Sequence, residues 1–193
     1  MNKALLLALT AFAALAAGAV ETIYRGAAQD EKNVLCYYQG GKFYADAARK
    51  ECLYAHPGHC VCKGPGPASK QKNALYSFNG GKMYKGASSD KKDVVATIVE
   101  SRRRNGAVVE AKIYSGFVIT REEHHERADK TDVYVHKVSR DGQSEEKVPA
   151  LYTVSNGKVY KGDSTDDADC VMSYTGELTA SRVLFAAVEL LGR

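Results

Sequence analysis

The chain of 193 residues lacks the short motifs that mark common enzyme active sites. It has no Gly-x-Ser-x-Gly nucleophile elbow, no glycine-rich phosphate-binding loop and no dinucleotide-binding fingerprint. Carboxylates are plentiful, but the sequence places no pair of them for acid–base chemistry. We therefore expect no cofactor, and we favour a non-catalytic protein over an enzyme such as a glycan hydrolase.

Tryptophan is also missing, although the chain has 12 tyrosines. Tyrosine favours strands and tolerates half-buried positions, so this balance fits a β-rich protein. The net charge of +4 is mild and is not concentrated in one part of the chain. Nucleic-acid binding calls for a clustered basic face with stacking aromatic side chains, so we expect no nucleic-acid partner.

Long hydrophobic runs are limited to one, which follows Lys3 and covers residues 4–17. The run is short for a bilayer span, and Ala17-Gly18-Ala19 has the small-x-small pattern of a cleavage site. We predict a signal peptide over residues 1–19, a secreted or periplasmic protein, and no membrane span after cleavage. An uncleaved membrane anchor is the alternative. Because no cysteine follows the leader closely, we do not expect a lipoprotein.

Three segments align without a gap: residues 33–44, 73–84 and 149–160. Each contains a run of alternating residues, a two-residue turn and a second run that ends in tyrosine. The turns are Gly40-Gly41, Gly80-Gly81 and Asn156-Gly157. Such pairs supply the two positive φ angles of a type I′ turn, so the sequence predicts three β-hairpins of one kind.

A second repeated word, apolar-Tyr-x-Gly, occurs at residues 23–26, 83–86, 113–116 and 159–162, with a degraded copy at 43–46. Three copies lead into the polar loops 27–33, 87–93 and 163–169. Short polar side chains recur in them at two aligned positions: Asp30, Asp90 and Asp166 at one, and Asn33, Asp93 and Asp169 at the other. We expect these side chains to shape the loops by bonding nearby backbone. Calcium bound by Asp163, Asp166, Asp167 and Asp169 is the alternative, but the spacing does not match an EF-hand.

Repeated strand–turn–strand units gain a core by packing on their neighbours, and a few copies favour closure around an axis, which removes exposed sheet edges. We therefore predict an all-β fold of repeated hairpins in a pseudo-rotational, flower- or barrel-like arrangement. It forms a single domain over residues 20–193.

The chain ends in an amphipathic segment, residues 180–191, with Thr179 placed as its N-cap. Its apolar stripe contains Val183, Leu184, Ala187, Val188 and Leu191, and Phe185 and Leu190 widen it. We predict one buried α-helix that closes a face or an end of the β assembly.

The words Tyr-Lys-Gly-x-Ser-Thr, then an Asp-led strand, then Leu-Tyr-x-x-x-Asn-Gly resemble the repeats of the four-fold beta flower domain family. The resemblance covers residues 23–44, 73–98 and 149–191. It implies hairpins around a pseudo-four-fold axis in a bacterial protein, and it brings no catalytic residues.

Two stretches interrupt the repeats and are predicted to be insertions: residues 45–72 and the charged residues 117–148. The first contains Cys52, His56, His59, Cys60 and Cys62. A disulfide-stapled loop is the favoured interpretation. The alternative is a zinc or copper site with His56, His59, Cys60 and Cys62 as ligands. The spacing fits neither covalent haem nor a zinc ribbon.

The chain has five cysteines, an odd number, so at least one is free or pairs between chains. Cys60 and Cys62 are too close to bridge each other without strain. We predict a disulfide from Cys52 to Cys60 or Cys62, and a contact between Cys36 and Cys170 if the first and last units adjoin.

In the charged insertion, residues 121–127 are expected to form either a short exposed helix or, as we favour, a solvated connection. His125 and Asp129 are one helical turn apart, but no third metal ligand is visible. Arg102, Arg103 and Arg104 precede Asn105-Gly106 and are predicted to decorate another hairpin tip.

Tyrosines recur at equivalent places: Tyr24, Tyr84, Tyr114 and Tyr160. A ring of them around an axis could bind sugar or peptide, and filling of the core is the alternative. We predict an exported non-catalytic domain of the bacterial envelope that is structural or binds a protein or glycan through its loops or these tyrosines. The alternative is a periplasmic metal-binding or redox protein that uses the cluster from Cys52 to Cys62.

Overall fold

The computed structural model describes residues 19–192, apart from 57, 66–72, 127–131 and 142–147. For residues 124–126 and 132–137 it describes the backbone alone. The predicted signal peptide and the pairing of His125 with Asp129 fall outside what is described.

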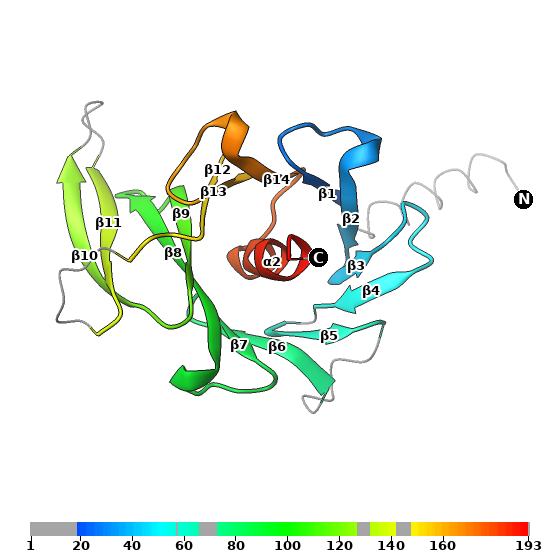
Figure 1. Cartoon of the computed structure of the whole chain (residues 1–193), viewed down its shortest axis with the longest axis horizontal. Coiled ribbons are helices and arrows are strands. Elements are labelled where there is room, and N and C mark those ends of the chain that lie inside the picture. Colours follow the sequence, from blue (N-terminus) through cyan, green and yellow to red (C-terminus); the bar gives the residue numbers. More distant parts are fainter. Residues whose placement is uncertain (1–18, 57, 66–72, 127–131, 142–147, 193) are drawn as a thin grey trace, which may run out of the picture.

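Twelve antiparallel strands form a closed ring in which each strand pairs with both of its neighbours (Figure 1). Order around the ring follows order along the chain, and the first strand pairs with the last. The strands are β1 (Glu21–Arg25), β2 (Val34–Gln39), β3 (Lys42–Tyr44), β4 (Cys52–Ala55), β5 (Cys60–Lys63), β6 (Ala74–Asn79), β7 (Lys82–Lys85), β8 (Val94–Arg103), β9 (Val108–Ser115), β12 (Tyr152–Ser155), β13 (Lys158–Lys161) and β14 (Cys170–Tyr174). The predicted all-β fold with rotational closure is confirmed.

The three aligned hairpins adopt one conformation. Both residues of each turn have positive φ, between 50° and 79°, as a type I′ turn requires. The strand residues that flank the turns pair in the same register: Gln39 with Lys42, Asn79 with Lys82 and Ser155 with Lys158. The hairpin prediction is therefore confirmed. The arginine-rich tip between β8 and β9 is also a turn, closed by a bond from Gly106 N–H to the Arg103 carbonyl, 2.8 Å.

The ring contains six two-stranded units. The second strand of each unit carries one fully buried residue at the same position: Ile23, Phe43, Val61, Met83, Ile113 and Val159, all 0% exposed. In five of the six units the strand register shifts directly after this residue, which marks a repeated β-bulge. The resemblance to a four-fold family stays a prediction.

The segment predicted as a Cys/His insertion is one of these units, so that prediction is wrong for β4 and β5. Leu53-Tyr54 and Lys63-Gly64 match Leu75-Tyr76 and Lys85-Gly86 of the next unit. The repeat is hard to see in the sequence because Cys62 stands where the other units have tyrosine, and because Gly58-His59 stands where the aligned hairpins have Gly-Gly or Asn-Gly.

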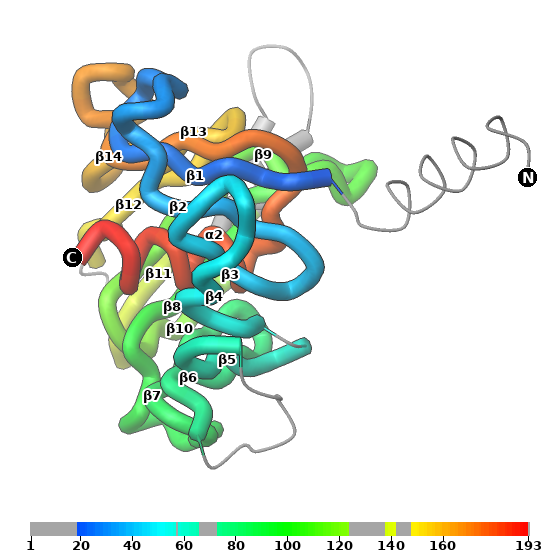
Figure 2. Tube along the Cα trace, turned by 90° about the vertical axis from the view of Figure 1, so that its right-hand side faces the viewer, coloured from blue at the N-terminus to red at the C-terminus, as the bar shows by residue number. Residues whose placement is uncertain are grey.

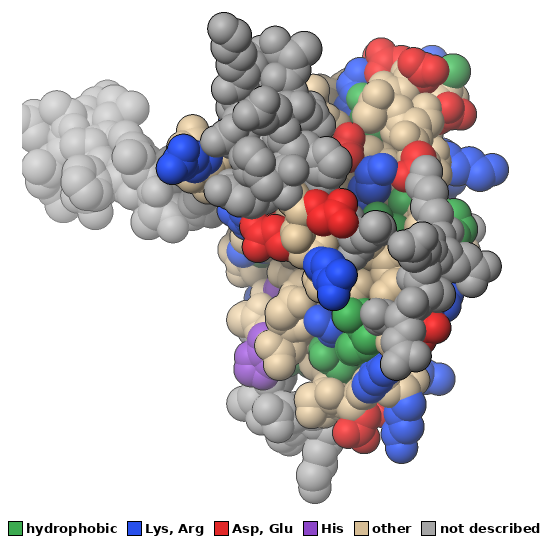
Figure 3. Space-filling model, turned by 90° about the vertical axis from the view of Figure 1, so that its left-hand side faces the viewer, with side chains coloured by type: hydrophobic (Ala, Val, Ile, Leu, Met, Phe, Trp, Pro, Cys, Tyr) green, Lys and Arg blue, Asp and Glu red, His purple; other side chains and the backbone are tan. Residues whose placement is uncertain are grey.

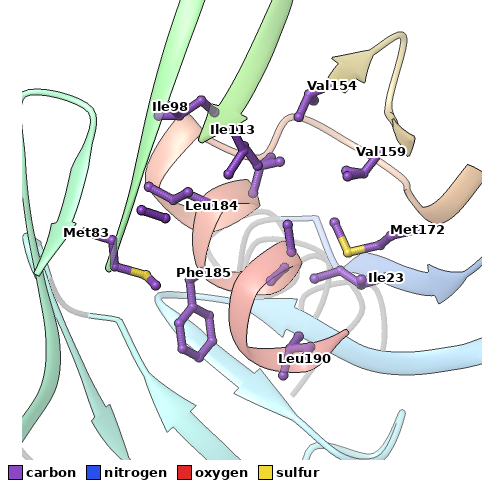
Figure 4. Packing of buried hydrophobic residues seen from close by; sticks show 14 of the residues in the cluster. Ile23, Met83, Ile98, Ile113, Val154, Val159, Met172, Leu184, Phe185 and Leu190 are labelled. Carbon is purple, nitrogen blue, oxygen red and sulfur yellow. The ribbon is translucent and has the colours of Figure 1, made fainter. Parts of the chain in front are cut away.

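Helix α2 (Ala180–Phe185) and the π-helical turn η5 (Ala186–Leu190) lie inside the ring (Figures 1 and 2). Six of their residues are buried, and core side chains of the surrounding strands point toward them (Figure 4). These six are Val183, Leu184, Phe185, Ala186, Ala187 and Leu190. The closing helix is confirmed, but it fills the lumen instead of covering one end.

The π-helical turn changes which side chains are buried. A continuous α-helix would place Val188 and Leu191 on the buried stripe, whereas both are only half-buried. The wider turn brings Leu190 into the core at 6% exposure instead. Thr179 is the N-cap residue as predicted, but it uses its carbonyl, which accepts from the Arg182 and Val183 amides at 2.9 and 3.0 Å.

Three loops end in short 3-10 helices: η1 (Glu31–Asn33), η3 (Lys91–Asp93) and η4 (Asp167–Asp169). Each is closed by the same backbone bond, from the third helical residue to the carbonyl of Asp30, Asp90 or Asp166. The side chains of Asp30, Asp90 and Asp166 make no cap bond, so the prediction is wrong for this position. At the second position the Asn33 amide donates to the Ala28 carbonyl at 3.2 Å, as predicted. Serine hydroxyls accept the Asp90 and Asp166 amides instead.

The charged insertion forms a hairpin of β10 (Ile119–Glu126) and β11 (Asp132–Ser139) outside the ring, on the left in Figure 1. It attaches where Val133 and Tyr134 pair with Arg103 and Arg102 of β8. Residues 121–126 form neither the short helix nor the favoured solvated connection, because they pair with a partner strand rich in β-branched and aromatic residues. Acidic and basic side chains are interspersed on this face of the molecule (Figure 3).

Candidate functional site

One end of the ring is built by glycines that follow the second strands, and we call it the glycine end. Five of these glycines donate their N–H to a carbonyl of the neighbouring first strand at 2.7–2.8 Å. All five have positive φ, from 65° to 72°, which glycine adopts without strain. They are Gly26, Gly64, Gly86, Gly116 and Gly162.

A basic residue stands directly before four of these glycines. We define the cationic rim as Arg25, Lys63, Lys85 and Lys161, all of them exposed. Equivalent positions on strands of a ring lie at similar heights along its axis. The four positive charges are therefore distributed around one mouth of the ring.

Cross-strand pairing indicates that the rim faces the mouth. Lys63 lies directly opposite Tyr54, and Lys85 lies opposite Tyr76. Both tyrosine hydroxyls donate to the helix carboxylate of Glu189 inside the ring, at 3.1 and 2.8 Å. Because directly opposite residues of an antiparallel pair share one face, the two lysines also project from the inner face of the wall.

The tyrosine–glutamate contacts fix the helix to the wall near this mouth. Burial, together with the hydrogen bond to Glu189 and its negative charge, raises the pKa of Tyr76 to about 12. Tyr76 therefore stays a hydrogen-bond donor at physiological pH.

A hollow of about 480 Å³ opens between the last and first units at the glycine end. Arg25 and Lys161 of the cationic rim line it together with apolar and aromatic side chains, among them Leu151, Tyr152, Val171 and Leu191. Leu151 is 43% exposed. The size is within the range of small-ligand sites, and the lining combines positive charge with apolar surface.

The rim differs from the outer wall in whether its positive charges are paired with carboxylates. On the outside, Lys112 pairs with Asp163 at 2.6 Å and Lys158 pairs with Asp167 at 2.7 Å. Within the described residues, no ion pair involves any of the four rim cations. The four rim cations are therefore open to an external anion.

The opposite mouth, which we call the turn end, holds a polar cluster of Glu21, Tyr38, His56 and Arg182. The Arg182 guanidinium lies over the Tyr38 ring, 4.5 Å from its centroid, and His56 packs on Phe78 at 5.2 Å. Tyr38 and His56 are each only 4% exposed. In the described part of the chain, four buried side-chain atoms lack a hydrogen-bond partner, and each residue of the cluster supplies one.

Burial shifts the titration of this cluster. It lowers the pKa of His56, and the positive charge of Arg182 lowers it further. It raises the pKa of Glu21, although Arg182 acts in the opposite direction. His56 is consequently held neutral beside a guanidinium.

The repeated tyrosines do not surround an open axis, because α2 occupies the lumen. Tyr84, Tyr114 and Tyr160 are buried at 5–7% exposure and Tyr24 is half-buried, and none belongs to the core cluster around the helix. Tyr114 packs in a separate cluster with Val118, Val148 and Ala150. Burial, together with the negative charges of Asp163 and Glu110, raises the pKa of Tyr114 to about 12. A ligand-binding role for these tyrosines stays a prediction.

The four proposed metal ligands do not form one site. Ala55 pairs with Cys62, so the next residue, His56, is on the opposite face of the wall from Cys62. Among the described residues, no group of three or more His, Cys, Asp or Glu side chains is placed to hold a metal ion, in the Asp-rich loop 163–169 or elsewhere.

None of the predicted disulfides is formed, because none of the five cysteines is joined to another: Cys36, Cys52, Cys60, Cys62 and Cys170. The register explains the Cys52 result. Cys62 lies opposite Ala55, three residues along β4 from Cys52, a distance of about 10 Å that a disulfide does not span.

The contact expected between Cys36 and Cys170 is also absent, although the first and last units do adjoin. Strand β1 lies between the two strands that carry these cysteines. Two inter-strand spacings amount to about 9.6 Å, which again exceeds the reach of a disulfide.

The cationic rim and its hollow were not predicted from the sequence. The signal was present in the repeated words Tyr-Arg-Gly and Tyr-Lys-Gly, whose basic residue recurs before the glycine. The sequence alone does not show that this basic residue points toward the mouth, because its direction depends on the strand register.

No family model, curated protein or solved structure matches the chain. Within the described residues, no helix combines the length and the apolar character that crossing a bilayer requires.

Proposed function

We propose that this protein is an exported, non-catalytic binding domain of the bacterial envelope, and that it holds an acidic glycan at the cationic rim. The supporting observation is that four exposed cations without an ion pair among the described residues stand at equivalent positions around one mouth of the ring, whereas Lys112 and Lys158 of the outer wall are paired. Export rests on the N-terminal segment, and the absence of catalysis rests on the missing motifs.

The chemistry of the hollow favours a carboxylate-bearing sugar chain over a small anion. The cations of the rim are spread around a mouth of the ring, so a ligand that carries a charge on successive sugar units can engage several of them. Tyr152 and Leu151 add an aromatic and an apolar surface beside Arg25 and Lys161. Aromatic side chains of this kind combine apolar area with a polar handle.

The test measures binding of polygalacturonate, with neutral dextran as the uncharged control. Binding to polygalacturonate should weaken as salt rises, because exposed charges are screened. The double variant Arg25→Gln/Lys161→Gln should bind about tenfold more weakly, which corresponds to about 1.4 kcal/mol.

A matched double variant, Lys32→Gln/Lys92→Gln, removes the same charge from exposed loop positions and should bind like the wild type. Equal losses in both double variants would reject the rim as the binding site. Preference for poly-L-glutamate would reassign the ligand to an acidic polypeptide. Turnover of a hydrolase substrate panel would overturn the non-catalytic assignment.

A further inference from the structure

Strand β5 carries two cysteines on one face of the wall. Cys60 and Cys62 flank Val61, which is fully buried in the core cluster around the helix. Because side chains alternate along a strand, both thiols point away from this core. Neither of them belongs to a core cluster, although each is only 4% exposed.

The two sulfur atoms are neighbours. Residues two apart on one strand project from the same face, with Cα atoms roughly 6.6 Å apart, and the Cys60 and Cys62 side chains share a hydrogen bond. Burial raises the pKa of the Cys60 thiol, and the contact with Cys62 acts in the same direction. The residues directly opposite on the adjoining strands are small: Ser77 faces Cys60, and Ala55 and Ala74 face Cys62. The pair is therefore held together in a place with little water and no bulky side chain across the sheet.

Thiolates prefer soft metal ions, and the number of ligands decides which ion fits. Zinc requires four ligands in a structural site, whereas monovalent copper is stable between two sulfurs. His56 lies on the other face of the wall, and the described residues place no third His, Cys, Asp or Glu beside the two thiols.

We propose that Cys60 and Cys62 form a two-coordinate site for a soft monovalent metal ion, Cu(I). The ion replaces the two thiol protons and forms a linear S–Cu–S unit. Its oxidation state does not change, and two protons are released to solvent for each ion bound. The site is separate from the cationic rim and does not depend on the proposed glycan binding.

The test is an anaerobic titration of the reduced, full chain with Cu(I), using bathocuproine disulfonate as competitor. The wild type should retain one Cu(I) per chain against the competitor. X-ray absorption of this complex should show two sulfur ligands and no nitrogen. Cys60→Ser and Cys62→Ser should each lose retention by at least about tenfold, because a single thiolate cannot complete the site.

Two variants serve as controls. Cys52→Ser changes a thiol on the adjacent strand, and His56→Phe removes the nearest buried imidazole, so both should retain Cu(I) like the wild type. Loss of retention in either control, a three-coordinate or nitrogen-containing spectrum, or no retention by the wild type would overturn the proposal. The wild-type spectrum decides the case even if a cysteine variant fails to fold.

Discussion

His56 occupies a repeat position that holds aromatic side chains in neighbouring units. Tyr38 and Phe78 stand at the equivalent place, and His56 packs on Phe78. The imidazole is as buried as Tyr38 and more buried than Phe78, but it carries a titratable nitrogen that lies near Arg182. Burial and this guanidinium both oppose its protonation.

We predict that His56 weakens the fold in mild acid. Its pKa is lower in the folded state than in the unfolded state, so the unfolded chain binds more protons as pH falls below about 6.5. The free energy of unfolding should therefore decrease with falling pH, by at most about 1.4 kcal/mol per pH unit for this one group. His56→Phe should lack this component. Urea denaturation at pH 7.5, 6.5 and 5.5 measures the difference.

The control for this prediction is His59→Asn, which changes an exposed histidine of the same turn and should keep the wild-type slope. Glu21 contributes with the opposite sign, since its raised pKa favours the folded state as pH falls toward 4.5. That contribution is common to all three proteins and cancels in the comparison. The same pH dependence in His56→Phe and wild type would contradict the account.

At the scale of the elements, the turns differ in how closely they approach the neighbouring strand. Gly80 and Gly81 both have positive φ, at 53° and 73°. A Cβ atom at Gly80 would meet nothing within 4 Å, whereas a Cβ atom at Gly81 would lie 2.7 Å from the Ile98 carbonyl oxygen. The second glycine of this turn is therefore required by packing as well as by conformation.

Gly81→Ala should destabilise the protein more than Gly80→Ala. The left-handed conformation alone costs an alanine about 1–2 kcal/mol, and this cost applies to both positions. The backbone clash at Gly81 should add at least about 1 kcal/mol, of the size found for overpacking. Thermal and urea unfolding of the two variants provide the measurement. Equal losses would show that β8 does not pack against this turn.

The hairpins could be predicted from sequence because glycine and asparagine pairs at fixed spacing have one conformational explanation. The unit β4–β5 could not, because its cysteines and histidines suggested chemistry, while its repeat signal was reduced to Leu-Tyr and Lys-Gly. The π-helical turn was also missed, since the apolar pattern of residues 180–191 fits an α-helix of ordinary period. Hydrophobic pattern determines that the segment is buried, but contact with the strands decides which of its residues are buried.

For the whole molecule, the sequence supported closure through a general argument about sheet edges, and the structure achieves it by pairing β1 with β14. The number of units and the position of the helix inside the ring depend on long-range packing that local periodicity does not encode. The arrangement of the cationic rim depends on the same long-range packing. Its residues are visible in the sequence, but only the cross-strand register directs them toward a common mouth.

Closure of the six-unit ring is the central claim, and the junction of β1 with β14 tests it most directly. Tyr24 pairs with Ser173 across this junction, although 149 residues separate them along the chain. In an assigned spectrum of the folded protein, backbone protons of these two residues should give nuclear Overhauser contacts, together with those of the pair Ile23 and Tyr174. A spectrum in which β1 contacts β2 alone, and in which its outward amides exchange freely with solvent, would contradict the closed ring.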